Sequence, residues 1–333
     1  MKLSYYFYES TYDNKVNRFA NADFSGLLLK LTNEQGQSGY ANYHALSAFG
    51  DPPAKEFLQG FKNDGLTVRH HLILQYLQQD LQNRIHSTDA LAGAFQIENH
   101  KLITDPLSCD KSKMEELLQN NFRIFKLKMG RDLTKESLWL TRHIEFFKAN
   151  KILLRLDFNE CFKIDEFEKW QKELQLHKQA IIDYYEDPCP YEESAWQKWQ
   201  LQGLALAKDV RFSTEPILTK GIEVFVLKPA LLNIIEWLKK LENPKKYRFV
   251  VTHYMDTALG VAQATASALK LKFFVKEGLG VCGLLPANQL PKNLQWDLQT
   301  RGPHLLFKDD MGIGFTEELN QIAWTSFDGK LAM

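Results

Sequence analysis

Two lysines alternate with apolar residues in the short run Phe125-Lys126-Leu127-Lys128-Met129. Alternation along a β-strand places Lys126 and Lys128 on one face and the three apolar residues on the other. Lysine is almost never fully buried unless an opposite charge pairs with it. If this run is an interior strand, as its apolar residues indicate, the fold must bring carboxylates to the same face.

From about residue 98 the sequence repeats one pattern, a short apolar run followed by an amphipathic helical stretch. This alternation predicts βα units and a parallel sheet. Eight such units in about 180 residues favour a closed (β/α)8-type barrel of the α/β class over an open sheet. The expected strands are 101–104, 124–129, 152–156, 181–185, 204–207, 224–227, 249–251 and 273–275.

The segments on either side of the barrel lack this rhythm. Strand-like runs at Leu3–Tyr8 and Gly26–Thr32, followed by a helical stretch at Val68–Ile85, predict a small α+β domain. We therefore expect three parts: an N-terminal α+β capping domain (1–97), a barrel catalytic domain (98–280), and a C-terminal segment that packs back on the capping domain (281–333).

Composition narrows the class of protein. Lys plus Arg and Asp plus Glu both number 41, and the formal net charge of zero argues against a general nucleic-acid binder. No apolar run approaches the roughly 20 residues of a membrane span, and the N-terminus does not read as a signal peptide. The four cysteines are widely spread without a CxxC pair, which predicts free thiols in a reduced, cytoplasmic protein.

Polar side chains stand at the ends of the apolar runs, where barrels of this type have their active sites. The third run carries Arg155, Asp157 and Asn159 at alternate positions, and therefore on one face. Five charged residues at the ends of these runs are separated in sequence by 29, 29, 23 and 19 residues, about one βα unit each. We therefore expect their side chains at the same height on successive strands. They are Lys128, Asp157, Glu186, Asp209 and Lys228.

Three carboxylates in one cavity repel one another, and a divalent cation relieves that repulsion. Oxygen ligands without His or Cys favour Mg²⁺ or Mn²⁺ over zinc, so Asp157, Glu186 and Asp209 predict such a site. A partly desolvated lysine beside a divalent cation can act as a base. A metal opposite Lys128 is suited to removing a proton α to a carboxylate of a small-molecule substrate.

Two other features are open to two interpretations. The loop at 49–53, which contains Gly50, is either a mobile lid over the barrel mouth or a plain connection. His253 is either a satisfied structural histidine or a substrate contact.

At this point the residues resemble a known family. Lys126-Leu127-Lys128 resembles the KxK motif of the enolase superfamily, in its muconate-lactonising branch. The segments resembling the metal ligands and the opposite lysine of that branch are Asp157-Phe158-Asn159, Glu186-Asp187-Pro188, Asp209 and Lys228-Pro229. Within the branch the resemblance is closest to the o-succinylbenzoate synthases, through Arg155 before the metal aspartate, the segment 252–260, and Glu277-Gly278-Leu279-Gly280.

The resemblance implies a Mg²⁺-dependent lyase that dehydrates 2-succinyl-6-hydroxy-2,4-cyclohexadiene-1-carboxylate to o-succinylbenzoate, a step of menaquinone biosynthesis. Lys128 would remove the α-proton, Lys228 would stabilise the intermediate as a cation, and Lys126 would support Lys128 electrostatically. The implied substrate contacts are Arg155, Asn159, Thr252, Gly50, Gly278 and the helix start at Thr257, whose free N–H groups could receive a carboxylate.

Two alternatives of different classes remain. An N-acylamino-acid racemase or dipeptide epimerase would use Lys128 and Lys228 as a two-base pair on the same scaffold. The Asp-x-Asp common at the eighth strand of the epimerases is absent here, which lowers that interpretation. A non-catalytic barrel that binds a small molecule would need none of the charged positions to be filled.

Overall fold

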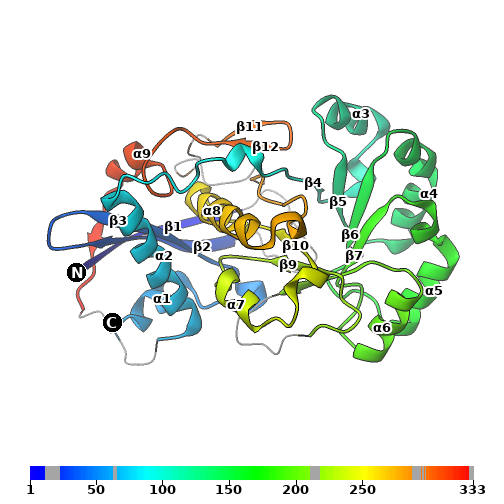
Figure 1. Ribbon diagram of the computed structural model, residues 1–333, viewed down its shortest axis with the longest axis horizontal. Helices are drawn as coiled ribbons and strands as arrows, with labels where there is room; N and C mark the ends of the chain where they lie inside the picture. Colours follow the sequence, from blue (N-terminus) through cyan, green and yellow to red (C-terminus); the bar gives the residue numbers. More distant parts are fainter. Residues whose placement is uncertain are drawn as a thin grey trace.

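Two sheets organise the chain (Figure 1). The computed structural model describes residues 1–11, 23–62, 66–210, 218–286, 294, 296 and 298–329. In these residues an antiparallel sheet has the order β13-β1-β2-β3, and a parallel sheet has the order β10-β9-β8-β7-β6-β5-β4. Figure 1 shows helix α8 (Ala258–Val275) between the two sheets.

The N-terminal sheet is held against two helices. Its strands are β1 (Lys2–Thr11), β2 (Asp23–Thr32), β3 (Ser38–Ala45) and β13 (Thr325–Ser326), and the helices are α1 (Ala54–Gly60) and α2 (Val68–Ile85). A Cβ on Gly39 would lie 2.2 Å from the carbonyl oxygen of Leu77, so only glycine lets β3 approach α2 this closely. The α+β character predicted for this part of the chain is confirmed.

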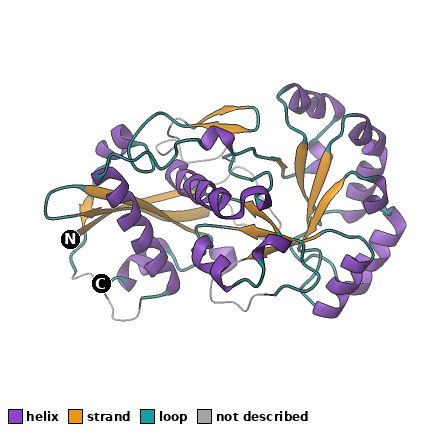
Figure 2. Cartoon of the chain, viewed as in Figure 1, coloured by secondary structure: helices purple, strands orange, loops and turns teal. Residues whose placement is uncertain are grey.

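Strands and helices alternate through most of the parallel sheet, as predicted, although among the described residues no helix lies between β8 and β9. Figures 1 and 2 show α4, α5 and α6 along the outer side of β5, β6 and β7. The elements are β4 (Lys101–Ile103), α3 (Lys111–Gln119), β5 (Ile124–Lys128), α4 (Leu133–Ala149), β6 (Leu153–Asp157), α5 (Ile164–Leu174), β7 (Ile182–Glu186), α6 (Glu193–Leu201), β8 (Leu206–Val210), β9 (Val224–Leu227), α7 (Ile234–Lys240) and β10 (Arg248–Val251).

The core lies between these strands and their helices. Phe125 and Leu127 of β5 are fully buried in this layer, together with Trp196 and Trp199 of α6. Burying an aliphatic or aromatic side chain of this size contributes roughly 1.5–3 kcal/mol, so the outward face of each strand holds the barrel together. The inward face is therefore left for the polar residues, as the alternation in β5 predicts. A small apolar cluster fills part of that interior: Tyr184, Ala207, Val224, Val226 and Val250.

The eighth strand predicted at 273–275 is wrong. Helix α8 continues to Val275, and Phe273 and Phe274 are 83% and 61% exposed on its surface. An alanine-rich helix propagates through this aromatic pair, because no helix-breaking residue precedes Lys276, which has a φ of 49°.

Residues 279–283 take the eighth position instead. They form parallel bridges from Leu279 to Phe249 and from Gly283 to Thr252 at β10, and from Cys282 to Asn99 ahead of β4. The Gly283 N–H donates to the Val251 carbonyl at 2.8 Å. This segment joins the two edges of the parallel sheet, so the barrel closes across the boundary predicted at residue 280.

The C-terminal segment returns to both parts of the chain. Its elements are β11 (Gln299–Arg301), β12 (His304–Leu306), α9 (Thr316–Asn320) and β13. Ser326 of β13 pairs with Ser4 of β1. The Ile313 and Tyr40 N–H groups both donate to the carboxylate of Asp80 in α2, at 2.8 and 2.9 Å.

Asn42 of β3 fastens the N-terminal sheet to the barrel. Its amide nitrogen donates to Asp256 at 3.2 Å, its carbonyl oxygen accepts from Thr257 at 3.2 Å, and its backbone N–H donates to Gln263 at 3.0 Å. All three partners follow the C-terminal end of β10 or lie in α8. The N-terminal sheet is therefore seated at the end of the barrel where strand-end side chains converge.

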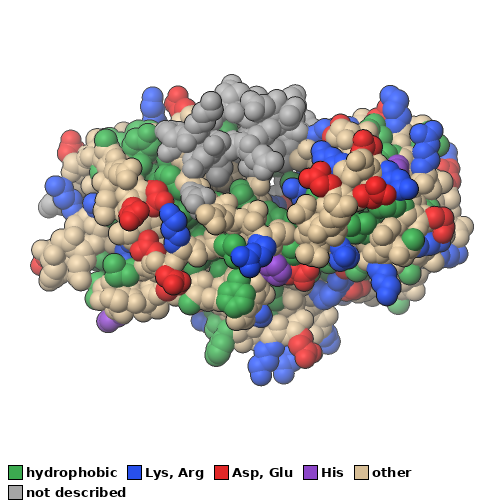
Figure 3. Space-filling model, turned by 90° about the horizontal axis from the view of Figure 1, so that it is seen from above, with side chains coloured by type: hydrophobic (Ala, Val, Ile, Leu, Met, Phe, Trp, Pro, Cys, Tyr) green, Lys and Arg blue, Asp and Glu red, His purple; other side chains and the backbone are tan. Residues whose placement is uncertain are grey.

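Surface properties agree with the composition. Figure 3 shows Lys and Arg side chains interspersed with Asp and Glu over one face of the molecule. All four cysteines are free, as predicted. Among the described residues, no helix combines the length and apolar character needed to cross a bilayer.

His44 of β3 is a buried histidine next to Tyr8, with Nδ1 3.1 Å from the tyrosine hydroxyl. Burial lowers the pKa of His44 to about 3, so it stays neutral in the folded protein. An unfolded histidine titrates near 6.5. Below pH 6.5 the histidine binds a proton in the unfolded chain but not in the folded chain. The free energy of unfolding is therefore highest above pH 6.5 and falls as the pH falls towards 3.

We therefore expect the cost of His44→Gln to depend on pH. At pH 7.5 the variant should have a lower free energy of unfolding than the wild type. At pH 5 this difference should be about 2 kcal/mol smaller, because acid lowers the free energy of unfolding of the wild type through His44 but has no such effect on the variant. Urea denaturation at both pH values measures the difference. An equal cost at both would contradict a neutral, buried His44.

Candidate active site

Three charged residues end three neighbouring strands. Lys128 is the last residue of β5, Asp157 the last of β6 and Glu186 the last of β7. Lys128 is in register with Asp157, and Asp157 with Glu186. The expectation that these side chains stand at one height is confirmed for these three residues.

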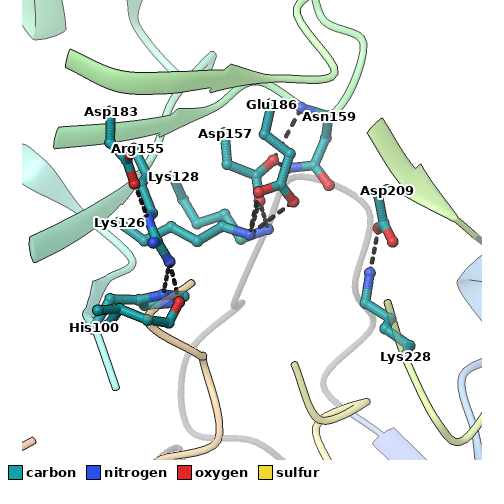
Figure 4. A network of polar contacts seen from close by, with 11 residues as sticks. His100, Lys126, Lys128, Arg155, Asp157, Asn159, Asp183, Glu186, Asp209 and Lys228 are labelled. Carbon is teal, nitrogen blue, oxygen red and sulfur yellow. Dashed lines mark hydrogen bonds and ion pairs between the residues drawn. The ribbon is translucent and has the colours of Figure 1, made fainter. Parts of the chain in front are cut away.

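Lys126 connects the two carboxylates (Figure 4). Its Nζ lies 2.7 Å from both carboxylate oxygens of Glu186 and 2.9 Å from Oδ2 of Asp157. Lys128 Nζ lies 2.5 Å from the same Asp157 oxygen. Lys126 is only 6% exposed, so these carboxylates are the partners that a buried lysine requires.

The three buried groups shift one another's titration. Burial lowers the pKa of Lys126, but Asp157 and Glu186 outweigh it and raise that pKa well above its ordinary value. Burial raises the pKa of Asp157, yet Lys126 and Lys128 hold it far below its usual range. Burial, followed by the charge of Asp157, raises the pKa of Glu186 to about 7. Opposed shifts of neighbouring groups are typical of functional sites.

Asp209 and Lys228 form a separate pair. Glu186 is in register with Ala207, so Asp209 stands two residues further along β8 on the same face. Lys228, directly after β9, forms an ion pair with Asp209, and Figure 4 shows this pair beside the Lys126 cluster. The expectation of one common height is therefore wrong for these two residues, because strands of a barrel are staggered.

Asp209 nevertheless belongs to the same electrostatic environment. Its charge contributes to the raised pKa of Glu186, after burial and Asp157. Burial raises its own pKa, and Lys228 reverses this to give a lowered value. Oδ1 of Asp209 is buried without a hydrogen-bond partner.

The donor chemistry of the three carboxylates suits a hard divalent cation, although lysines occupy their oxygen atoms in this structure. Within the described residues, no group of three or more His, Cys, Asp or Glu side chains is close enough to hold a metal ion. Lysine ammonium groups instead neutralise Asp157, Glu186 and Asp209. The three carboxylates offer oxygen donors, the type that Mg²⁺ and Mn²⁺ prefer, and Oδ1 of Asp209 has no hydrogen-bond partner.

Arg155 lies on β6 two residues before Asp157 and is 2% exposed. Its Nε donates to Asp183 at 2.7 Å, and its Nη1 donates to His100 at 2.8 Å and to the Val281 carbonyl at 2.6 Å. These bonds tie β6 to the segment that closes the barrel. Arg155 thus binds protein groups through Nε and Nη1, so a substrate contact is not needed to explain it.

The sequence pattern missed His100 and Asp183. His100 precedes β4, at the strand start rather than its end, and burial lowers its pKa well below the ordinary value. Asp183 lies at a register shift, where Leu154 pairs with Ile182 but Arg155 pairs with Tyr184. A bulge of this kind changes the direction of a side chain, which simple alternation does not reveal.

Three other predicted contacts lie near the strand ends. The Asn159 side-chain amide donates to Asp157 Oδ1 at 2.7 Å and so orients that carboxylate. Thr252 follows β10, and its Oγ1 is buried without a hydrogen-bond partner. Thr257 caps α8, and its hydroxyl donates to Asn42, which leaves the backbone of the helix start, rather than this hydroxyl, for a ligand.

Gly50 lies in a loop held over the residues that follow β10. It has a φ of 82° after the short 3₁₀ helix η1 (Ser47–Phe49). Asp51 accepts from the Leu46 N–H at 2.9 Å and forms an ion pair with Arg69. The Phe49 ring lies 6.2 Å from the Tyr254 ring. The loop therefore lies against the barrel mouth, and its role as a lid stays a prediction.

Gly278 does not lie at the end of the barrel where the other predicted substrate contacts lie. Gly278 is wrong as a strand-end contact: a Cβ there would lie 3.5 Å from the carbonyl oxygen of Tyr247, which precedes β10 at the opposite end of the barrel. The cause is the shifted eighth strand, which begins after Gly278.

His253 is within 3.1 Å of the Leu285 carbonyl through Nε2 and accepts from the Asp256 N–H through Nδ1, which favours the structural interpretation.

Comparison with known proteins gives one similar curated sequence. The chain is 29% identical over 304 residues to o-succinylbenzoate synthase from Bdellovibrio bacteriovorus, covering 90% of each chain. No family model matches the sequence.

Solved structures share the fold. A mandelate racemase/muconate lactonizing protein from Herpetosiphon aurantiacus matches with a TM-score of 0.72 and 14% identity, over 94% of this chain and 96% of the other. The o-succinylbenzoate synthase from Thermosynechococcus elongatus, complexed with Mg in its active site, matches with a TM-score of 0.56 and 19% identity, over 87% and 97%. The resemblance predicted from the strand-end motifs is therefore confirmed: the chain has the fold of the mandelate racemase/muconate lactonizing proteins and is similar in sequence to an o-succinylbenzoate synthase.

Proposed function

We propose that the protein is an o-succinylbenzoate synthase, a lyase that removes water from 2-succinyl-6-hydroxy-2,4-cyclohexadiene-1-carboxylate in menaquinone biosynthesis in the cytoplasm. The observation that carries the proposal is the in-register set Lys128, Asp157 and Glu186, with Lys126 bonded to both carboxylates. The similarity to the Bdellovibrio synthase over nine-tenths of the chain supports this reaction among those of the fold.

Asp157, Glu186 and Asp209 are the residues that would hold Mg²⁺, with Mn²⁺ as a substitute. Support comes from their oxygen donors, their position at successive strand ends, and the unpartnered Oδ1 of Asp209. When bound, the cation supplies positive charge that stabilises the negative charge developing on the substrate carboxylate.

Lys128 is the proposed base. Its Nζ takes the proton α to the carboxylate, and the C–H electron pair is left on the ring. The same proton is then available to the departing hydroxyl, so the C–O bond breaks, water leaves and the ring becomes aromatic. Lys228 lies across the site as a cation that stabilises the charged intermediate, and Lys126 keeps Asp157 and Glu186 in place.

A racemase on this scaffold is the second candidate. Lys128 ends β5 and Lys228 follows β9, with three strands of the sheet between them, so the two lysines can approach a substrate from two sides as opposed bases do. The name of the similar Herpetosiphon structure includes mandelate racemase, which supports the same alternative. The dehydration is preferred because the curated sequence relative is a synthase.

An assay with the two substrate classes separates the candidates. With the cyclohexadiene carboxylate and Mg²⁺, we expect the ultraviolet band of the diene to disappear as o-succinylbenzoate forms. Exchange of the α-hydrogen of an N-acylamino acid with solvent deuterium, without loss of the diene band, would favour the racemase. Absence of both reactions would favour a binding protein.

Lys128→Ala should lower kcat by at least about a thousandfold, because general acid–base groups contribute roughly 10²–10⁴-fold and here one group serves both proton transfers. Circular dichroism and thermal unfolding should show an intact fold. Lys239→Ala is the matched control, since Lys239 is an exposed lysine bonded to Glu236 at 2.7 Å. Turnover of the Lys128 variant at the wild-type rate would sink the assignment of the base.

A further inference from the structure

A second charge cluster lies next to the proposed metal ligands. Lys208 Nζ is 2.9 Å from Oδ1 of Asp187 and 3.1 Å from Oε1 of Glu160. The Asp187 side chain is only 4% exposed, and that of Lys208 is 16% exposed. One ammonium thus compensates two carboxylates, one of which is almost completely removed from water.

Each member of this cluster is close in sequence to a different proposed ligand. Lys208 immediately precedes Asp209 on β8, and Asp187 immediately follows Glu186 at the end of β7. Glu160 stands three residues after Asp157 in the loop that follows β6. The cluster therefore connects the three segments that carry the three ligands.

Lys208 faces away from the cavity. Adjacent residues of a strand point to opposite sides, so Lys208 points outward where Asp209 points inward. Its register partner Phe225 packs against Trp237 in the outer layer, with ring centroids 5.0 Å apart. Lys208 acts on the ligands through the backbone that carries them and does not touch the proposed cation.

The segments that Lys208 joins hold a constrained backbone. Asn159, Glu160 and Asp187 are non-glycine residues with positive φ, at 47°, 58° and 41°. Such residues persist only where their surroundings hold them, and they cluster at functional sites. The Glu160 N–H donates to the Asp187 carbonyl at 2.7 Å, which bonds the two loops directly.

Loss of the ammonium would release this arrangement. Asp187 would be left as a buried carboxylate without its cation, beside the carboxylate of Glu160. A buried charge that loses its partner is strongly unfavourable, so the two carboxylates would repel each other and shift the loops that carry them. Movement of either loop displaces the adjoining ligand, Asp157 or Glu186.

We propose that Lys208 is a positioning residue for the divalent cation, holding the three strand-end segments so that Asp157, Glu186 and Asp209 face one point. This inference rests on the proposed function, because it takes those residues as the metal ligands. Residues that orient metal ligands without touching the metal contribute roughly 10–100-fold to metal affinity.

The test is calorimetric titration of the metal-free protein with Mg²⁺ and with Mn²⁺. Lys208→Met removes the charge and keeps most of the side-chain stem, and it should weaken binding of both ions by about 10–100-fold. Lys208→Arg, which keeps the charge, should restore most of the affinity. Lys198→Met is the matched control, because Lys198 forms an exposed ion pair with Glu168 at 2.6 Å outside the site.

Kinetics give an independent readout. The Lys208→Met variant should need more Mg²⁺ for half-maximal rate, while kcat at saturating Mg²⁺ stays within about threefold of the wild type. If this variant does not fold, the double variant Lys208→Met/Asp187→Asn removes both charges. Its Mg²⁺ affinity should be about 10–100-fold weaker than that of the wild type and similar to that of Asp187→Asn alone, since the two groups act as one pair.

The outcomes distinguish this inference from the proposed function. Wild-type affinity in a folded Lys208→Met variant overturns the positioning role and leaves the ligand assignment standing. So does a double variant that binds the ions as tightly as the wild type. A wild-type protein that binds neither Mg²⁺ nor Mn²⁺ overturns the ligand assignment, and this inference with it.

Discussion

The ammonium of Lys126 between Asp157 and Glu186 is the interaction on which the site depends. Two carboxylates buried at neighbouring strand ends would repel each other and could not both stay ionised without a cation between them. Removing charges from water is costly, and the cost is met only by close pairing of good geometry. Lys126 provides that pairing at 2.7–2.9 Å, and the ends of β5, β6 and β7 are thereby held together.

The rest of the barrel serves to hold this charge cluster at one end. Below it, Arg155 bonds to Asp183, to His100 and to the carbonyl of Val281, and so joins β6 to the closing segment. Around it, the outward faces of the strands bury their apolar side chains against the helices. Above it, Asn42 fixes the N-terminal sheet to the start of α8.

Much of this arrangement could be predicted from the sequence, because strand alternation and the βα repeat are local signals. Lys126, Lys128 and Asp157 stand out by alternation alone, and helix α2 was delimited by its apolar periodicity. The eighth strand could not be predicted, since Phe273 and Phe274 have strand-like composition but continue a helix. The offset of Asp209 depends on barrel stagger, and Asp183 on a bulge, neither of which is encoded in residue spacing.

The central claim is that the strand-end carboxylates, neutralised by lysines in the free protein, form one divalent-cation site. The most direct measurement is a crystal structure of the protein soaked in Mn²⁺, with anomalous scattering to locate the ion. We expect a single strong peak coordinated by Asp157, Glu186 and Asp209, with Lys128 and Lys228 on opposite sides of it. A peak elsewhere, or an ion bound without Asp209, would show that the three carboxylates do not form one cation site.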